Sequence, residues 1–198
     1  MRGYGRLDLQ KLRNLQGDRT MKELLKKLIV DKINTWTETD IYAISLFVYD
    51  DEDNPSKPTV TLGFNTESHV NQLNPEGNDP ETRWNYAFWL QNQELEFGYD
   101  DTADVVKEWI ENQGFTYHDD CCYDDDENDE GITNAFTSLL VDIVKEIHQE
   151  GVLTNKFGKE LPILIHELEY YDQIADQNVE ANGEELVKEF TDWIYSMY

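Results

Sequence analysis

The feature that most constrains this chain is its charge: 42 acidic residues against 16 basic ones give a formal net charge of −26 over 198 residues. The chain can nonetheless build a folded core, because 39% of its residues are hydrophobic and 12% are aromatic. A folded surface this acidic repels nucleic acids and anionic lipids and attracts basic proteins. Inhibition or masking of a basic protein is therefore the first functional hypothesis, and solubility alone is the alternative.

Length and composition indicate one domain in the cytoplasm. The chain falls within the usual size range of a single domain, roughly 100–200 residues. No uninterrupted apolar run comes near the ~18 residues that a membrane span requires, and the N-terminal residues lack the apolar stretch of a secretory signal. The two cysteines, Cys121 and Cys122, are adjacent, which favours reduced thiols over a disulfide that joins distant segments.

The first twenty residues differ in charge from the rest. Five basic and two acidic residues give residues 1–20 a net charge of +3, so the remainder of the chain carries −29. Gly17 and Asp18 can be encoded by a purine-rich run that resembles a ribosome-binding site shortly before the codon of Met21. Residues 1–20 are interpreted either as a non-native extension or as a short native helix with leucines on one side. We expect residues 21–198 to form the domain.

Apolar residues at helical spacing predict the helices of the fold. The clearest stripe runs from Ile132 to Ile147. Asn182, with Glu185 three residues later, resembles a capping box that opens the last helix. Residues 167–179 are ambiguous. The expected helices lie near Leu24, Val105, Phe136 and Phe190.

Runs of β-branched and aromatic residues predict strands. Five are expected, near Ile41, Thr59, Arg83, Leu95 and Pro162. The first two form an antiparallel hairpin around the acidic loop Asp50–Pro55, and residues 65–81 are expected to be loop. Residues 83–90 also fit a helical turn, because short apolar runs do not fix a period. The predicted fold class is α+β, with a central, mainly antiparallel sheet covered by helices in a single domain.

Two acidic segments supply the candidate partner-binding residues. The stretch 118–130 is the most polar of the chain, and the hairpin loop is the second segment. Clustered like charges repel one another in the free protein, and a cationic partner relieves that repulsion and associates faster. A solvated charge run is the alternative for the first segment. The candidates are Asp119, Asp120, Asp124, Asp125, Asp126, Glu127, Asp129, Glu130, Asp50, Asp51, Glu52 and Asp53.

A calcium- or metal-regulated binding module is the alternative function for residues 119–130. Asp126, Asn128, Glu130 and Gly131 match the start of an EF-hand loop. Thr137 stands where that loop requires a bidentate glutamate, so the match fails at a position that calcium needs. A calcium-dependent rise in thermal stability would favour this alternative.

No catalytic motif is recognised in the sequence. His118 lies beside the two cysteines, but no second Cys/His cluster completes a tetrahedral metal site. The pair 166–167 begins like a zinc-protease helix, and Tyr170 stands in place of its second histidine. Trp84 and Trp89 fit core packing better than a carbohydrate or base site. We therefore assign no catalytic residue, no metal and no cofactor, and an enzyme of unrecognised type is the third class of function.

Four segments together resemble an uncharacterised group of small acidic bacterial proteins. Members of this group are associated with polymorphic or contact-dependent toxin systems as presumed immunity proteins. The segments are DIYAISLFVYDDED (40–53), TLGFNTE (61–67), RWNYAFW (83–89) and HELEYYDQIADQNVEANGEELVKEF (166–190). They look structural, so the resemblance transfers no catalytic residue.

The resemblance implies an immunity function, which agrees with the argument from charge. Many toxin domains are basic because their targets are nucleic acids. An acidic antidote can dock over such an active site by imitating the charge of the substrate. We expect a basic protein, a cognate toxin such as a nuclease, as the partner, and neither nucleic acid nor membrane.

Overall fold

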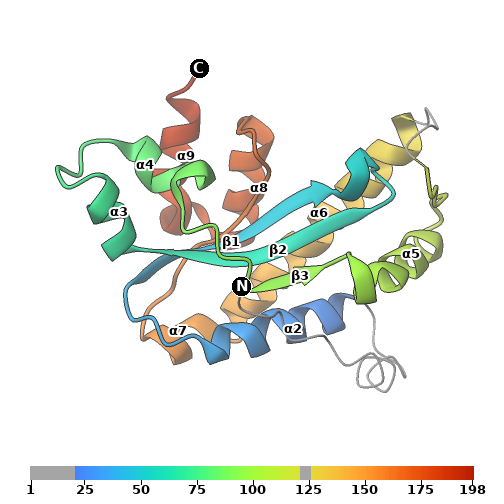
Figure 1. Cartoon of the computed structure of the whole chain (residues 1–198), viewed down its shortest axis with the longest axis horizontal. Helices are drawn as coiled ribbons and strands as arrows, with labels where there is room; N and C mark the ends of the chain where they lie inside the picture. The colour runs from blue at the N-terminus through green and yellow to red at the C-terminus, as the bar shows by residue number, and fades with distance from the viewer. Residues whose placement is uncertain (1–20, 121–125) are drawn as a thin grey trace.

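A four-stranded sheet lies at the centre of the computed structural model, which describes residues 21–120 and 126–198 (Figure 1). The strands are β1 (Ile41–Asp50), β2 (Pro58–Thr66), β3 (Leu95–Phe97) and β4 (Ile163–His166). β2 pairs antiparallel with β1 and with β3, whereas β4 pairs parallel with β1, so the order is β3-β2-β1-β4. The predicted α+β class with a mainly antiparallel sheet is confirmed.

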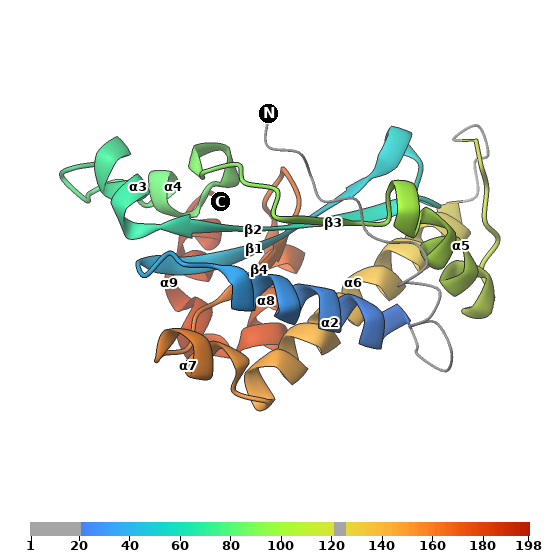
Figure 2. The same cartoon turned by 60° about the horizontal axis from the view of Figure 1, so that its bottom comes forward.

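Helices cover both faces of this sheet (Figure 2). The longer ones are α2 (Met21–Thr35), α5 (Ala103–Asn112), α6 (Asp126–Gln149), α8 (Asp172–Asn182) and α9 (Glu184–Tyr195). The shorter ones are α3 (Glu67–Leu73), α4 (Pro80–Trp84), α7 (Val152–Phe157) and the 3-10 turns η1 (Asp51–Asp53), η2 (Tyr86–Phe88) and η3 (Asp100–Thr102). All four helices expected from the sequence are present.

Two apolar clusters fill the space between the sheet and the helices. Alternate residues of β1 point to opposite faces, so Ile44 and Leu46 join one cluster while Ala43 and Phe47 contact the other. The first cluster packs under α2, α5 and α6, and the second under α4 and α9. Both faces of β1 are therefore covered, which explains why its sequence is an almost continuous apolar run and not an alternating one.

The prediction of a strand near Arg83 is wrong, because the aromatic residues 84–89 lie in and around α4 and η2. Asp79 caps α4 by accepting a hydrogen bond from Glu81 N at 3.0 Å, and a proline occupies the first turn. Asn85 then caps η2. The two tight turns bring Trp84 and Trp89 into the same cluster, which a straight strand would not do. The expectation of loop over residues 65–81 is corrected too, since α3 and the start of α4 lie there.

The capping box expected at Asn182 is also wrong: Asn182 ends α8, and Gly183 precedes α9. Its amide instead bonds the free edge of β4, accepting from Ile163 N at 2.8 Å and donating to Ile163 O at 3.0 Å. Asn178 bonds Ile165 N and O in the same way, at 2.9 and 2.7 Å. Four helical residues advance by about 6 Å and two strand residues by about 6.6 Å, so the two amides match two peptide groups of the strand.

Replacing Asn178 with alanine should lower the free energy of unfolding by about 1–2 kcal/mol. The substitution leaves the Ile165 N–H without its partner at a buried edge and the Ile165 carbonyl with only Gln177 Nε2 as a side-chain donor, which costs more than an exposed hydrogen bond. Urea denaturation measures the change, with Asn155→Ala on the exposed face of α7 as the control. Equal stability of the two variants would contradict the role assigned to the amide.

Candidate partner-binding surface

The fold brings the two acidic segments together at one end of the molecule, although about seventy residues separate them in the sequence. β1 ends at Asp50, and η1 forms the tip of the hairpin. Asn54 Nδ2, just past the tip, donates to His118 O at 3.0 Å, and His118 N donates to Ser56 Oγ at 3.2 Å. The hairpin tip is thereby bonded to the stretch that leads toward α6, and Figure 1 shows the tip, α5 and the start of α6 at the same end.

The acidic stretch 118–130 is only partly a loop. Asp119 and Asp120 are exposed and precede residues 121–125, which lie outside the described ranges and include the candidates Asp124 and Asp125. The remaining candidates, Asp126, Glu127, Asp129 and Glu130, belong to the first turns of α6. The carboxylates of Glu127 and Asp129 lie near the positive end of the helix dipole, which offsets part of their mutual repulsion.

This helix removes the geometric basis for an EF-hand loop. Asp126, Glu130 and Gly131 lie in α6, where they cannot wrap around an ion as a calcium loop does. Gly131 has a packing role instead, because a Cβ there would come within 2.6 Å of the Phe115 ring. The described part of the chain contains no group of three or more His, Cys, Asp or Glu side chains placed to hold a metal ion.

Asp50 is the most perturbed carboxyl group at this end. It is partly buried where β1 leaves the sheet, and burial raises its pKa to about 6 with further contributions from Glu167, Asp129 and Asp53. Glu167 immediately follows β4, and parallel β1 and β4 end at the same edge of the sheet. Sequence reasoning missed Glu167 as part of the surface. Parallel pairing of the two strands was the signal that would have placed it there.

A pocket of about 230 Å³ opens between the hairpin tip, η3 and residues 117–119. Its lining includes Asp51, Lys57, Tyr99, Asp100, Tyr117 and Asp119. The backbone is left-handed at Glu52, Asp53 and Asp100, with φ of 57°, 55° and 43°. Such conformations cost about 1 kcal/mol or more outside glycine and tend to cluster at functional sites. We call the surface formed by Asp50–Asp53, Asp100, Asp119, Asp129 and Glu167 the acidic end.

A serine and a histidine also form a close pair, but deep inside the protein. Ser45 Oγ lies 2.8 Å from His166 Nε2, and His166 Nδ1 lies 3.0 Å from Glu167 O. The two side chains are 1% and 2% exposed, and the ring centroid of Tyr86 lies 4.8 Å from that of His166. Burial lowers the pKa of His166 to about 4. A substrate has no access to this pair, so we assign it to the packing of the core. His166 belongs to strand β4 and not to a zinc-protease helix.

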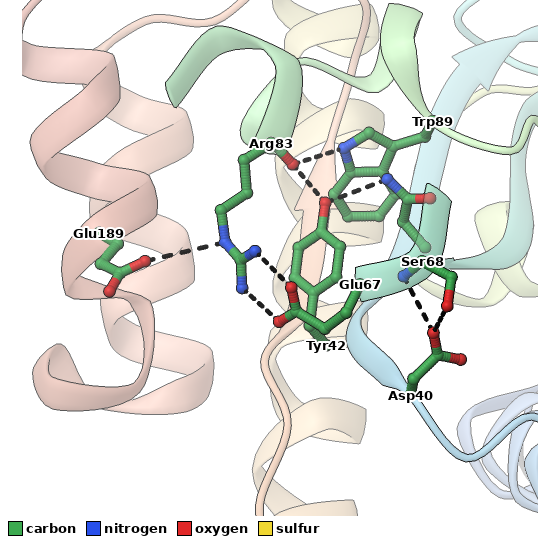
Figure 3. Close-up of polar contacts among 8 residues, drawn as sticks. Asp40, Tyr42, Glu67, Ser68, Arg83, Trp89 and Glu189 are labelled. Carbon is green, nitrogen blue, oxygen red and sulfur yellow. Dashed lines mark hydrogen bonds and ion pairs between the residues drawn. The ribbon is translucent and has the colours of Figure 1, made fainter. Parts of the chain in front are cut away.

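A second buried polar network surrounds Arg83 (Figure 3). Its guanidinium donates two hydrogen bonds to Glu67, at 2.8 and 2.9 Å, and lies 4.0 Å from the centre of the Tyr42 ring. The Arg83 carbonyl accepts from Trp89 Nε1 at 2.9 Å and from the Tyr42 hydroxyl. Trp84 and Trp89 are 6% and 5% exposed, so the prediction that they pack in the core is confirmed. The network joins α3 to α4, and none of its residues lines the pocket beside the hairpin tip.

Comparison with protein families, with curated proteins and with solved structures finds no match to this chain. Within residues 21–120 and 126–198, no helix combines the length and apolar character needed to cross a membrane.

Proposed function

We propose that this protein is an immunity or inhibitor protein that binds a basic toxin domain, such as a nuclease, through the acidic end. The observation that carries the proposal is the meeting of two acidic segments, distant in sequence, around one strained hairpin tip. Three aspartates, Asp51, Asp100 and Asp119, line the pocket beside this tip. The resemblance to presumed immunity proteins of toxin systems points the same way.

Inhibition in this proposal is steric, and electrostatics sets its speed. A toxin that cleaves nucleic acid presents a basic active site, which an acidic surface attracts over distances of about a Debye length, ~10 Å at 0.1 M salt. Once docked, the folded domain covers the site and the substrate cannot enter. The protein itself needs no catalytic residue and no cofactor for this task. It would act in the cytoplasm, where such a toxin meets its target.

Neutralising the hairpin tip should slow association with the toxin while leaving the fold intact. The variant D51N/D53N/D129N removes three carboxylates of the acidic end. The control E76Q/E184Q/E185Q removes three exposed carboxylates near α3 and α9, away from that end, so both variants have the same net charge. A toxin domain encoded by a neighbouring gene would serve as the partner, and stopped-flow fluorescence would measure its association rate at several salt concentrations.

We expect the tip variant to associate about 3–10-fold more slowly at 0.1 M salt, with a shallower salt dependence, because steering charges act mainly on the association rate. The control should match the wild type. In cells that express the toxin, the wild type and the control should restore growth better than the tip variant. Equal rates and equal salt slopes for both variants would contradict the acidic end as the docking surface. A neighbouring toxin that the wild type fails to neutralise would overturn the proposed function.

A further inference from the structure

The pocket beside the hairpin tip has the size of a single side chain. Its volume of about 230 Å³ is below the roughly 300–1,000 Å³ typical of sites for cofactors or drug-sized ligands. Its walls come from three separate parts of the chain, namely the hairpin tip, η3 with the start of α5, and residues 117–119. A site of this kind at a docking surface is where an anchoring side chain of a partner enters.

The walls combine tyrosine rings with carboxylates. Tyr99 is 43% exposed, so part of its ring is available to a ligand, and Tyr117 also lines the pocket. Asp51, Asp100 and Asp119 add a carboxylate from each of the three wall segments. Aromatic faces and carboxylates both favour a cation, and a cation that leaves water gains most from such contacts.

The cations already at the pocket do not cancel this preference. Lys57 donates to Glu52, which neutralises its charge within the hairpin. Lys107 Nζ lies 4.4 Å from the centre of the Tyr117 ring, so this wall already holds an ammonium group over an aromatic face. Because Lys57 is paired with Glu52 and Lys107 offsets only one of the three lining aspartates, an excess of negative charge remains at the pocket.

We propose that this pocket binds one arginine side chain of the basic partner; the inference rests on the proposed function and names the group that anchors it. Arginine fits better than lysine for two reasons. Its planar guanidinium stacks on a tyrosine face, and its five N–H donors can reach carboxylates on several sides at once, whereas an ammonium is a compact point charge. Arginine is also among the residues that contribute most to binding at interfaces.

The first test uses small probes and needs no partner protein. Nuclear magnetic resonance of the whole chain follows the Tyr99 and Tyr117 ring signals during titration with N-acetyl-arginine amide, N-acetyl-lysine amide and the uncharged N-acetyl-citrulline amide. We expect the arginine probe to shift both rings, the lysine probe to bind more weakly and the citrulline probe to leave them unchanged. Tyr99→Ala should weaken the arginine probe about fivefold, whereas Tyr195→Ala, which changes a similarly exposed tyrosine on α9, should not.

The second test uses the toxin and separates the two proposals. Tyr99→Ala should raise the Kd of the toxin about tenfold, mainly through faster dissociation, because a desolvated anchor acts on the dissociation rate. If the toxin binds Tyr99→Ala as tightly as the wild type, or if citrulline shifts the rings as arginine does, the arginine pocket is overturned while the proposed function stands. If arginine binds the pocket but no toxin is neutralised, the proposed function fails and the pocket stands. Thermal unfolding at the wild-type midpoint verifies that each variant is folded.

Discussion

Lowering the pH from 7 to 4 should remove about 3 kcal/mol of stability through His166 alone. The imidazole is buried among aromatic rings, and burial depresses its pKa from 6.5 to about 4. In the unfolded chain the same group takes up a proton at about pH 6.5. A depressed histidine pKa therefore contributes stability that is fully present above pH 6.5 and is lost as the pH falls through 4.

The local hydrogen bonds explain why protonation is so unfavourable. His166 Nδ1 faces the carbonyl oxygen of Glu167, so it carries the proton of the neutral ring, and Nε2 accepts from the Ser45 hydroxyl. A second proton on Nε2 would force the Ser45 hydroxyl to give up its donor role in this bond and would place a positive charge in a buried site. Both effects favour the unfolded chain in acid.

The comparison of wild type with His166→Gln isolates this contribution from all other titrating groups. Glutamine keeps an acceptor for Ser45 but does not titrate, so the variant will be less stable at pH 7 through lost ring packing. That deficit should shrink by about 3 kcal/mol by pH 4, as the wild type loses its advantage. Urea denaturation at each pH gives the difference, and His69→Gln, at a less buried histidine, is the control. A deficit that is constant with pH would contradict the depressed pKa of His166, as would a ring signal that titrates near pH 6.5.

The long elements of the fold were predictable because their apolar patterns satisfy a single period. The stripe that ends at Ile147 fixed α6, and the β-branched run that starts at Ile41 fixed β1. The hairpin followed from two such runs around an acidic turn. In these segments local preference and tertiary packing agree, so either one suffices to predict the structure.

The short elements were not predictable, because tertiary contacts decide them. Residues 83–90 suit a strand by composition, yet capping by Asp79 and the contacts of Arg83 with Glu67 hold them in turns. Asn182 has the sequence of a helix cap, but its amide is needed at the edge of β4. The acidic residues were recognised from the sequence alone. Their meeting with Glu167 at one end of the sheet depends on strand order, which no local pattern encodes.

Replacing Asp50 with asparagine should raise the free energy of unfolding by about 2–3 kcal/mol at pH 7. Burial and three neighbouring carboxylates raise the pKa of Asp50 from 3.8 to about 6, so at pH 7 the folded chain holds a charge that its surroundings disfavour. A raised carboxyl pKa reverses the usual sign: its contribution to stability is fully present below pH 3.8 and is lost as the pH rises through 6. Solvent screening at this partly exposed site places the effect below the full linkage value of ~3 kcal/mol.

The gain from Asp50→Asn should vanish below about pH 4, where Asp50 is protonated in both the folded and the unfolded wild type. Asp51→Asn, one residue further along the tip, is the matched control and should change stability by no more than about 0.5 kcal/mol. Urea denaturation between pH 3 and 8 measures both variants. An Asp50→Asn variant that is no more stable than Asp51→Asn at pH 7 would contradict the raised pKa.

The same substitution should weaken binding to the basic toxin, although it stabilises the free protein. A cation placed between Asp50, Glu167 and Asp129 favours their charged forms, so binding should release a proton from Asp50 near pH 6. Asp50 would then destabilise the free protein and strengthen the complex. This combination is expected of a residue that selection keeps for binding and not for stability. Calorimetry in two buffers of different ionisation enthalpy tests this for wild type and variant. Tighter toxin binding by Asp50→Asn, or no proton release by the wild type, would show that the strain at Asp50 has no part in recognition.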